Sequence, residues 1–182
     1  KIVLFGQGGH AKVVADTLFA CGHRIASVYD DNPKADNLAV FGGLSVGPAP
    51  LIIEAGEIWH VAIGSNIARL SVIKRYENAN ISLITIVHPS ASVSTFSNVG
   101  QGTFVAPLAT IGVDSEIGQG CIVNHGAVVD HDCSLADGVH VAPNATLAGG
   151  VQVGKATLVG AGAVILPNIK VGDNVIIGAN SV

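Results

Sequence analysis

Residues 117–141 read IGQGCIVNHGAVVDHDCSLADGVHV, and every sixth position from Ile117 to Val141 is Ile, Val or Leu. The same spacing runs without a break from Val87 to Ile177. A period of six is neither the roughly 3.6 of an α-helix nor the roughly 2 of a plain strand, so it indicates a repeat architecture. We interpret it as a chain that turns a corner after each short strand and returns one aliphatic side chain to a shared interior, since no single repeat buries its face alone.

The repeat has two further regularities. Small residues stand two positions before most aliphatic positions, as at Ser115, Cys121 and Cys133, and would let the chain approach the axis at a corner. Gly is frequent one position after them, as at Gly112 and Gly118, where we expect it to supply the backbone angles of a turn. The pattern resembles the left-handed parallel β-helix of hexapeptide repeats. That resemblance predicts about five triangular coils, in which residues eighteen positions apart lie one above another.

Residues 1–85 follow a different pattern, in which apolar runs alternate with stretches of helical character. We expect strands at 1–5, 25–29, 59–63 and 82–86 and helices at 11–21 and 67–78, while residues 34–56 carry no assignment. Such alternation is typical of a small, Rossmann-like parallel α/β sheet. The chain is therefore predicted to hold two domains, 1–85 and 86–182.

Composition narrows the classes of function. The formal net charge is −4 and no basic stretch occurs, so neither nucleic acid nor an anionic membrane is an expected partner. Gly, Pro and polar residues interrupt every apolar stretch, and the apolar start indicates a strand rather than a secretory signal. The three Cys show no metal-binding spacing, and Cys121 and Cys133 fall on the small positions of the repeat. We expect packed free thiols in a cytoplasmic protein.

The loop Gly6–His10 lies between the first predicted strand and helix. Its Gly residues would let phosphates approach the backbone N–H groups of the helix start, although a tight turn without a ligand would look the same. Asp30 ends the second strand, where it would meet a ribose or base or simply form a turn. Gly64–Asn66 follows the third strand, with Asn66 alternatively the cap of the next helix. On that helix, Arg69 would reach a phosphate or lie in solvent.

The segment Asp130–Asp132 places His131 between two carboxylates. An adjacent carboxylate holds an imidazole in one tautomer, which suits a general base, whereas a solvated corner would carry the same residues without function. Gly149 follows eighteen residues later and should stack on His131, where its N–H could bind the oxygen of a reacting carbonyl. For His125 and His140 a surface role is an open alternative to a role in the site.

These motifs together resemble one family. Residues 6–14, residues 62–66 with Arg69, and residues 130–133 with His140 and 148–150 are similar to the bacterial nucleotide-sugar acetyltransferases. That family includes UDP-4-amino-sugar N-acetyltransferases and NeuD-like sialic acid O-acetyltransferases, and the resemblance covers nearly the whole chain. It implies a homotrimer with active sites between the β-helices of adjacent chains. It also implies acetyl-CoA as co-substrate and no metal.

The resemblance also implies roles for individual residues. His131 would be the catalytic base, Asp132 or Asp130 its orienting acid, and Gly149 the donor to the acetyl carbonyl. Acetyl-CoA would lie near His140, Ala148, Gly149 and Pro167. The residues implied for the UDP-sugar are Gly8, Gly9, His10, Asp30, Asp31, Gly64, Ser65, Asn66 and Asn124. The family often has Glu in place of one Asp beside His131, and Asn in place of Ser65.

The predicted function is transfer of acetyl from acetyl-CoA to the 4-amino group of a UDP-linked amino-dideoxy sugar, by direct attack with His131 as base. One rival is O-acetylation of a sugar hydroxyl, such as that of sialic acid. A second is a carbonic-anhydrase-like zinc enzyme, which needs three His converging across a subunit interface, and the spacing of His125, His131 and His140 does not obviously provide them. A third is a sugar-nucleotide-binding scaffold without catalysis.

Overall fold

The computed structural model describes residues 1–182 apart from 35–40, 52, 54–55 and 78–80. The N-terminal strands are β1 (Ile2–Phe5), β2 (Ile25–Asp30), β3 (Val46–Pro48), β4 (Ile58–Val61) and β5 (Ser82–Leu83). They form one parallel sheet in the order β3-β2-β1-β4-β5, with α1 (Gly9–Ala20) after β1 and α2 (Asn66–Glu77) after β4. From β1 the sheet grows to one side through β2 and β3, and β4 and β5 are then added on the other side of β1. Open α/β sheets bind ligands where the strand order reverses in this way, so the loops after β1 and β4 border the expected crevice.

The predicted elements of this domain all occur, with one addition and one division. The addition is β3, which lies within the unassigned stretch 34–56. The division affects the predicted strand 82–86, because its end belongs to a different sheet and begins β6 (Ile86–Val87). The predicted end of the second helix, at Asn78, lies outside the described residues.

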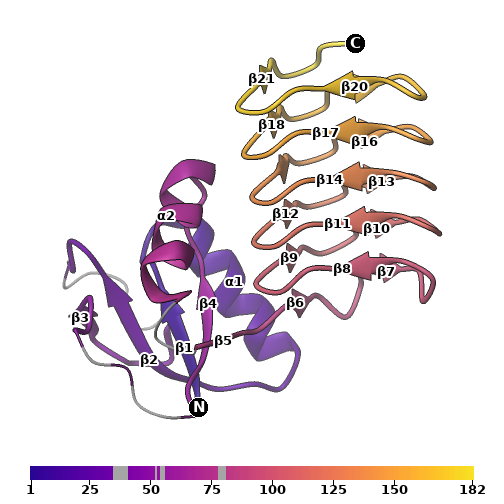
Figure 1. The fold of residues 1–182 in the computed structure, drawn as a ribbon. Coiled ribbons are helices and arrows are strands. Elements are labelled where there is room, and N and C mark those ends of the chain that lie inside the picture. Colours follow the sequence, from indigo (N-terminus) through magenta and orange to yellow (C-terminus); the bar gives the residue numbers. More distant parts are fainter. Residues whose placement is uncertain (35–40, 52, 54–55, 78–80) are drawn as a thin grey trace.

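The rest of the chain is a parallel β-solenoid, which rises as a stack of coils beside the N-terminal sheet (Figure 1). The first face holds β6, β9 (Phe104–Val105), β12 (Ile122–Val123), β15 (His140–Val141), β18 (Leu158–Val159) and β21 (Ile176–Ile177). The second face holds β7 (Ser92–Val93), β10 (Thr110–Ile111), β13 (Val128–Val129), β16 (Thr146–Leu147) and β19 (Val164–Ile165). The third face holds β8 (Asn98–Val99), β11 (Glu116–Ile117), β14 (Ser134–Leu135), β17 (Gln152–Val153) and β20 (Lys170–Val171).

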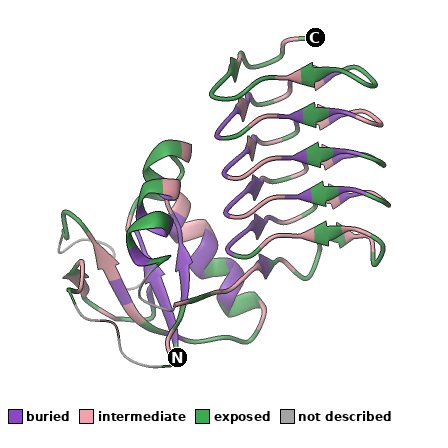
Figure 2. Ribbon diagram, viewed as in Figure 1, coloured by how far each residue is buried: buried purple, intermediate pink, exposed green. Residues whose placement is uncertain are grey.

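Each solenoid strand pairs with the strand one coil away. Val123 lies beside Val141 and Val141 beside Val159, a separation of eighteen residues as the period predicted. The aliphatic positions and the small corner residues together form one buried core, and buried residues recur as purple stretches of the ribbon from coil to coil in Figure 2. Cys121 and Cys133 belong to this core as free thiols, which confirms their predicted packing.

The glycines that follow the aliphatic positions serve a different purpose from the one predicted. Gly112 and Gly118 have ordinary backbone conformations, but a Cβ on either would lie 2.7 Å from a backbone nitrogen of the next coil. They are therefore needed because successive coils approach closely. The left-handed conformation of the turn occurs two residues later, as at Asp114 (φ 56°) and Gly120 (φ 61°), and recurs every six residues along the solenoid.

The two domains share a hydrophobic core. Phe104 and Ile122 point outward from the first face and are buried against Ala11 and Ala15 of α1. The same outward column continues through His140 to Leu158 and then to Ile176, which is 76% exposed. The N-terminal domain therefore covers only the lower coils of this face, and His140 lies where the cover ends. Within the described ranges, neither helix is long and apolar enough to cross a membrane.

Candidate functional site

His131 occupies the solenoid corner between β13 and β14, where the second face meets the third. Its Nδ1 lies 2.6 Å from Asp132 Oδ2, while its backbone N–H donates to Asp130 Oδ1 at 2.8 Å. Nδ1–H therefore donates to Asp132, and Nε2 is the nitrogen that can accept a proton. The hydrogen bond to Asp132, aided by the charge of Asp130, raises the pKa of His131. Of the two predicted orienting acids, Asp132 is the one whose carboxylate contacts the ring.

Gly149 lies directly against the His131 ring, one coil further on. A Cβ at Gly149 would stand 2.5 Å from His131 Cε1 and 2.6 Å from Nε2, so only Gly leaves room for the imidazole. The peptide before Gly149 is held from inside the solenoid, because the Cys133 thiol donates to Ala148 O at 3.3 Å. Burial raises the pKa of this thiol, which is consistent with a packing role rather than a nucleophilic one. Pro167 follows eighteen residues after Gly149 and is exposed.

His140, Asn124 and His125 form a hydrogen-bonded chain on the first face and its adjoining corner. Asn124 Oδ1 accepts from the backbone N–H of His125 at 2.9 Å and from its Nδ1 at 2.8 Å. Asn124 Nδ2 must then donate to His140 Nε2, 3.0 Å away. His140 therefore carries its proton on Nδ1 and is neutral, and burial lowers its pKa to about 4. It can donate a hydrogen bond but is poorly suited to act as a base.

Two more histidines lie behind this chain. His10 packs edge-on against Phe104, and its Nε2 is buried without a hydrogen-bond partner among the described residues. His60 is fully buried, with Nδ1 3.0 Å from Ile84 O. Burial lowers the pKa of His10 to about 3 and that of His60 to about 4. The side chain of His10 thus faces the domain interface, while its backbone belongs to the first turn of α1.

A cavity of about 490 Å³ opens at the ends of β1 and β2. Its lining comprises Gln7, Gly8, Gly9, Lys12, Asp30, Asn32 and Lys34. Gln7 braces it, since its side chain bonds both Asn32 O and the N–H of Lys34. The sequence interpretation overlooked Lys12 and Lys34. Lys12 could have been found from its position in the first turn of the helix after the Gly-rich loop, whereas Lys34 depends on the path of a loop.

The two predicted base-binding aspartates differ in their surroundings. Asp30 lines the cavity, and its carboxylate accepts the backbone N–H groups of Gln7 at 3.1 Å and Asn32 at 2.9 Å. Asp31 instead forms a two-point ion pair with Arg75 of α2, at 2.6 and 3.0 Å. The hydrogen bond from Arg75 holds the pKa of Asp31 below its usual range. Asp31 is therefore committed to α2, and contact with a base would require breaking this pair.

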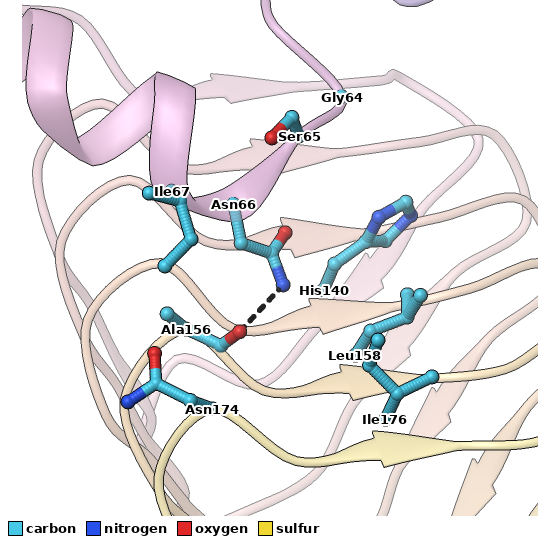
Figure 3. Close-up of a pocket in the computed structure, with 9 residues that line it drawn as sticks. All are labelled: Gly64, Ser65, Asn66, Ile67, His140, Ala156, Leu158, Asn174 and Ile176. Carbon is cyan, nitrogen blue, oxygen red and sulfur yellow. Dashed lines mark hydrogen bonds between the residues drawn. The ribbon is translucent and has the colours of Figure 1, made fainter.

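A second cavity, of about 260 Å³, lies between the start of α2 and the first face (Figure 3). Gly64, Ser65 and Asn66 form one side, and His140, Leu158 and Ile176 form the other. Ser65 caps α2, since its Oγ accepts the N–H of Ala68 at 3.5 Å, so the predicted cap at Asn66 is off by one residue. Arg69 is neither in solvent nor directed at a phosphate: it is 1% exposed, and all of its bonds are to protein oxygens.

The structure brings the predicted site residues together in two groups. The Gly-rich loop, Gly64–Asn66, Asn124 and His140 surround the crevice and the first face. His131, Asp130, Asp132, Gly149 and Pro167 lie at the opposite corner, with the solenoid between the groups. His125, His131 and His140 do not converge within one chain. In the described part of the chain, no three His, Cys, Asp or Glu side chains are arranged to hold a metal ion.

A ligand crevice in a parallel α/β sheet, joined to a hexapeptide solenoid with a His–Asp pair, defines a hexapeptide-repeat transferase. Comparison with known families agrees: residues 1–76 match the PglD N-terminal domain, and residues 114–149 and 150–182 match the bacterial transferase hexapeptide (six repeats). The chain belongs to the PglD-like family of hexapeptide-repeat sugar N-acetyltransferases.

Individual relatives support this assignment. A mutant perosamine N-acetyltransferase from Caulobacter crescentus, solved with CoA and GDP-perosamine, is 38% identical, with a TM-score of 0.92 over 98% of this chain and 86% of that one. The acetyltransferase domain of PglB from Neisseria gonorrhoeae, solved with acetyl coenzyme A, is 31% identical, with a TM-score of 0.90 over 100% and 89%. UDP-N-acetylbacillosamine N-acetyltransferase of Bacillus subtilis (strain 168) is 36% identical over an aligned length of 110 residues, and the match covers 56% of this chain and 49% of that relative.

Proposed function

We propose that this protein transfers the acetyl group of acetyl-CoA to the 4-amino group of a nucleotide-linked amino-dideoxy sugar. The observation that carries the proposal is the His131 ring, paired with Asp132 and packed on Gly149, in a chain that also holds a glycine-lined crevice. A base and a backbone donor at one point suit acyl transfer. The names of the relatives describe N-acetyltransferases of nucleotide sugars, and two of the structures contain CoA or acetyl-CoA.

The chemistry follows from the two nitrogen atoms of His131. The sugar amine attacks the thioester carbonyl, and the new C–N bond forms as the carbonyl π electrons move to oxygen. That oxyanion would be held by the N–H of Gly149. His131 Nε2 takes the proton lost by the nitrogen, while Asp132 stabilises the resulting imidazolium. The C–S bond then breaks, and the CoA thiolate leaves and is protonated, with no covalent enzyme intermediate.

We propose that the nucleotide of the substrate is uridine diphosphate rather than guanosine diphosphate. The Watson–Crick edge of guanine presents adjacent N–H donors, which a free carboxylate would satisfy. Here Asp31 is held by Arg75, and both oxygens of Asp30 already accept backbone N–H groups. No free carboxylate is thus offered to guanine in the cavity that Asp30 lines, and the Bacillus subtilis relative is named for a UDP-linked sugar, which supports the same choice. In the same cavity Lys12 and Lys34 supply positive charge for the diphosphate.

We infer that the active site is completed by a second copy of the chain in a homotrimer. His131 lies at the corner opposite the face that carries His140 and the crevice, so a sugar bound in one chain would meet the His131 of a neighbour. Acetyl-CoA would lie along the corner column of Gly149 and Pro167, beside Ala148. The side chains of Leu166 and Ile169, 54% and 46% exposed, offer an apolar lining there.

The test is mass spectrometry of UDP- and GDP-linked 4-amino-4,6-dideoxy sugars incubated with acetyl-CoA. The wild type should add the mass of one acetyl group, and His131→Ala should be slower by about 10²–10⁴-fold, the usual contribution of a general base. His131 is 55% exposed at its side chain, so the variant should keep its fold and oligomeric state. His23→Ala, at an exposed position outside both cavities used above, is the matched control. Wild-type protein that acetylates none of these sugars would overturn the proposal.

A further inference from the structure

Arg69 is a buried cation whose bonding is complete within the protein. Its Nε donates to Gly120 O at 2.6 Å, and its Nη1 donates to Ile63 O at 2.8 Å and Gly64 O at 3.2 Å. Its Nη2 donates to Asn66 Oδ1 and to Gly138 O, both at 2.9 Å. A guanidinium has five N–H groups, and here each of the five has an acceptor. A ligand phosphate would therefore find no donor left on this side chain.

The acceptors on the solenoid form a column. Gly120, Gly138 and Ala156 occupy the same corner on three successive coils, and each has a left-handed φ, of 61°, 68° and 55°. Arg69 binds the first two carbonyls. Asn66 binds the third, since its Nδ2 lies 3.0 Å from Ala156 O, the contact drawn in Figure 3, and 3.0 Å from Thr157 O. The start of α2 is thus registered to three coils at once.

Side chains of α2 also pack closely against this corner of the solenoid. A Cβ on Gly120 would lie 2.6 Å from Ile73 Cδ1, and one on Gly138 would lie 2.6 Å from Leu70 Cδ1. The two glycines are required both by their φ angles and by the closeness of α2. The other end of the network is the loop Gly64–Asn66, which borders the cavity shared with His140.

We propose that Arg69, with Asn66, is a positioning residue that sets the register between the sugar-nucleotide crevice and the solenoid. The proposal rests on the proposed function, because acetyl transfer is the step that needs both parts aligned. The 490 Å³ cavity lies wholly within the N-terminal domain, and the Gly149 column lies wholly on the solenoid. The sugar nucleotide and acetyl-CoA can therefore each bind without the contacts that Arg69 and Asn66 make with the solenoid, which we call the clamp. Only the approach of amine to thioester depends on it, and an error of about 1 Å in such an approach can cost about 10²-fold in rate.

The charge of Arg69 has a second effect that fits this role. It contributes to lowering the pKa of His10, His60 and His140, after the larger effect of burial. The clamp therefore helps keep neutral the histidines that lie between the two domains. Replacing Arg69 should raise the pKa of His140 and shift the pH dependence of transfer.

The experiment compares Arg69→Met, Arg69→Lys and the control Lys74→Met, an exposed cation on the same helix. For Arg69→Met we expect kcat to fall about 10²-fold while the Kd values of UDP and CoA stay within about twofold. Hydrogen exchange across residues 63–66 should accelerate. Lysine has three donors on a single nitrogen, so Arg69→Lys should recover only part of the rate. Lys74→Met should match the wild type in every measurement.

Three results would overturn the proposal. One is a kcat for Arg69→Met within threefold of the wild type. Another is a UDP Kd raised tenfold with unchanged exchange, which would make Arg69 a ligand contact. If Arg69→Met fails to fold, Asn66→Ala removes only the bonds to Asn66, and unchanged exchange and kcat there would count equally against it. If wild type acetylates no sugar nucleotide, the proposed function fails, whereas the clamp is still judged by exchange at 63–66 and by the two Kd values.

Discussion

At the scale of single residues, the orientation of His131 goes with the backbone conformation of its neighbour, Asp132. Asp132 has a φ of 58°, a left-handed conformation that Asp adopts more readily than most residues. This conformation accompanies the 2.6 Å contact between its carboxylate and the imidazole of the preceding residue. Asp130 bonds the backbone instead. Two chemically identical neighbours thus make different contacts: Asp132 with the imidazole ring, and Asp130 with the backbone of the corner.

Replacing Asp132 by Asn should separate these tasks. The amide oxygen of the new side chain can still accept from Nδ1–H, but the charge that raises the pKa of His131 is gone. A general base must be neutral, so activity rises with pH through its pKa, and the rising limb of kcat/KM should move to lower pH in Asp132→Asn. We expect the plateau to fall about tenfold as the base weakens. Asp130→Asn should shift the limb less, because Asp130 influences the ring by charge without bonding it. A limb that moves to higher pH would contradict this assignment.

Gly149→Ala tests the contact between coils at the same corner. The new methyl group would meet His131 at about 2.5 Å, so the ring must swing away from Asp132 or from the reacting carbonyl. We expect transfer to fall by about 10²-fold or more, with the melting temperature nearly unchanged because the ring is free to move into solvent. Gly172→Ala is the control, as its nearest neighbour would be 3.9 Å away. Equal rates in the two variants would remove Gly149 from the site.

The sequence could locate this corner because period and motif coincide there. Eighteen residues separate His131 from Gly149, and the resemblance to the hexapeptide β-helix, with three repeats in each coil, places one above the other. The difference between Asp130 and Asp132 lies in side-chain geometry, since one carboxylate meets the ring and the other the backbone, and the sequence does not show this. Arg69 could not be placed either, because four of its five acceptors are backbone carbonyls, two of them on distant solenoid coils, and carbonyls leave no residue-type signature.

At the scale of elements, the interface between α1, β4 and the first face is built from neutral histidines. His10 comes from α1, His60 from β4 and His140 from β15, and the charge of Arg69 on α2 contributes to lowering the pKa of each. The rest of this interface is apolar, because Phe104 and Ile122 are buried in one cluster with residues of α1. Adding protons there would place several positive charges around one buried cation. The contact between the domains should therefore depend on pH.

This arrangement predicts loss of stability in mild acid. In the folded protein the pKa values of His10, His60 and His140 lie at about 3, 4 and 4, below the ordinary 6.5, so the unfolded chain binds more protons. Stability is then full above pH 6.5 and declines as pH falls toward 4, by about 2 kcal/mol per histidine at pH 5. Urea unfolding at pH 7 and pH 5 measures it. His60→Asn, which keeps a donor near Ile84 O, should flatten the dependence, and an equal decline in both proteins would argue against the histidines as its source.

Element order in the N-terminal domain was largely predictable, since each strand and helix begins with a clear change of period. The strand β3 was not, because Val46–Pro48 has three residues, among them Gly and Pro, and is formed by pairing with β2 rather than by local preference. The role of the solenoid glycines could not be predicted either. Their frequency was visible, but whether a Gly serves a turn or a close approach depends on the neighbouring coil.

At the scale of the whole molecule, a single chain holds two groups of candidate site residues on opposite sides of the solenoid. The crevice opens beside the first face, and His131 occupies the opposite corner. Such a division fits a closed ring of copies, in which each chain gives one half-site to one neighbour and the other half-site to the next.

Mixing two inactive variants would test the division. Gly8 has open space around it and lines the nucleotide cavity, so Gly8→Phe should block that cavity without disturbing the fold. His131→Ala removes the base. If sites form between chains, unfolding and refolding an equal mixture should restore about a quarter of wild-type activity by random assortment in a closed ring. Mixing without exchange of subunits is the control. No recovery from mixed oligomers, confirmed by two distinguishable tags, would place both half-sites in one chain.

Val113, His131, Gly149 and Pro167 stack on successive coils. This stacking limits the lengths of insertion or deletion that the solenoid can accept. Removing one hexapeptide between His131 and Gly149 would turn everything beyond the cut by a third of a revolution. Gly149 would then no longer stack on His131, although every strand still found a partner. Removing eighteen residues would shorten the prism and preserve its faces. Insertions and deletions in this half of the chain should therefore survive selection in whole revolutions, and above Pro167 more freely than below it.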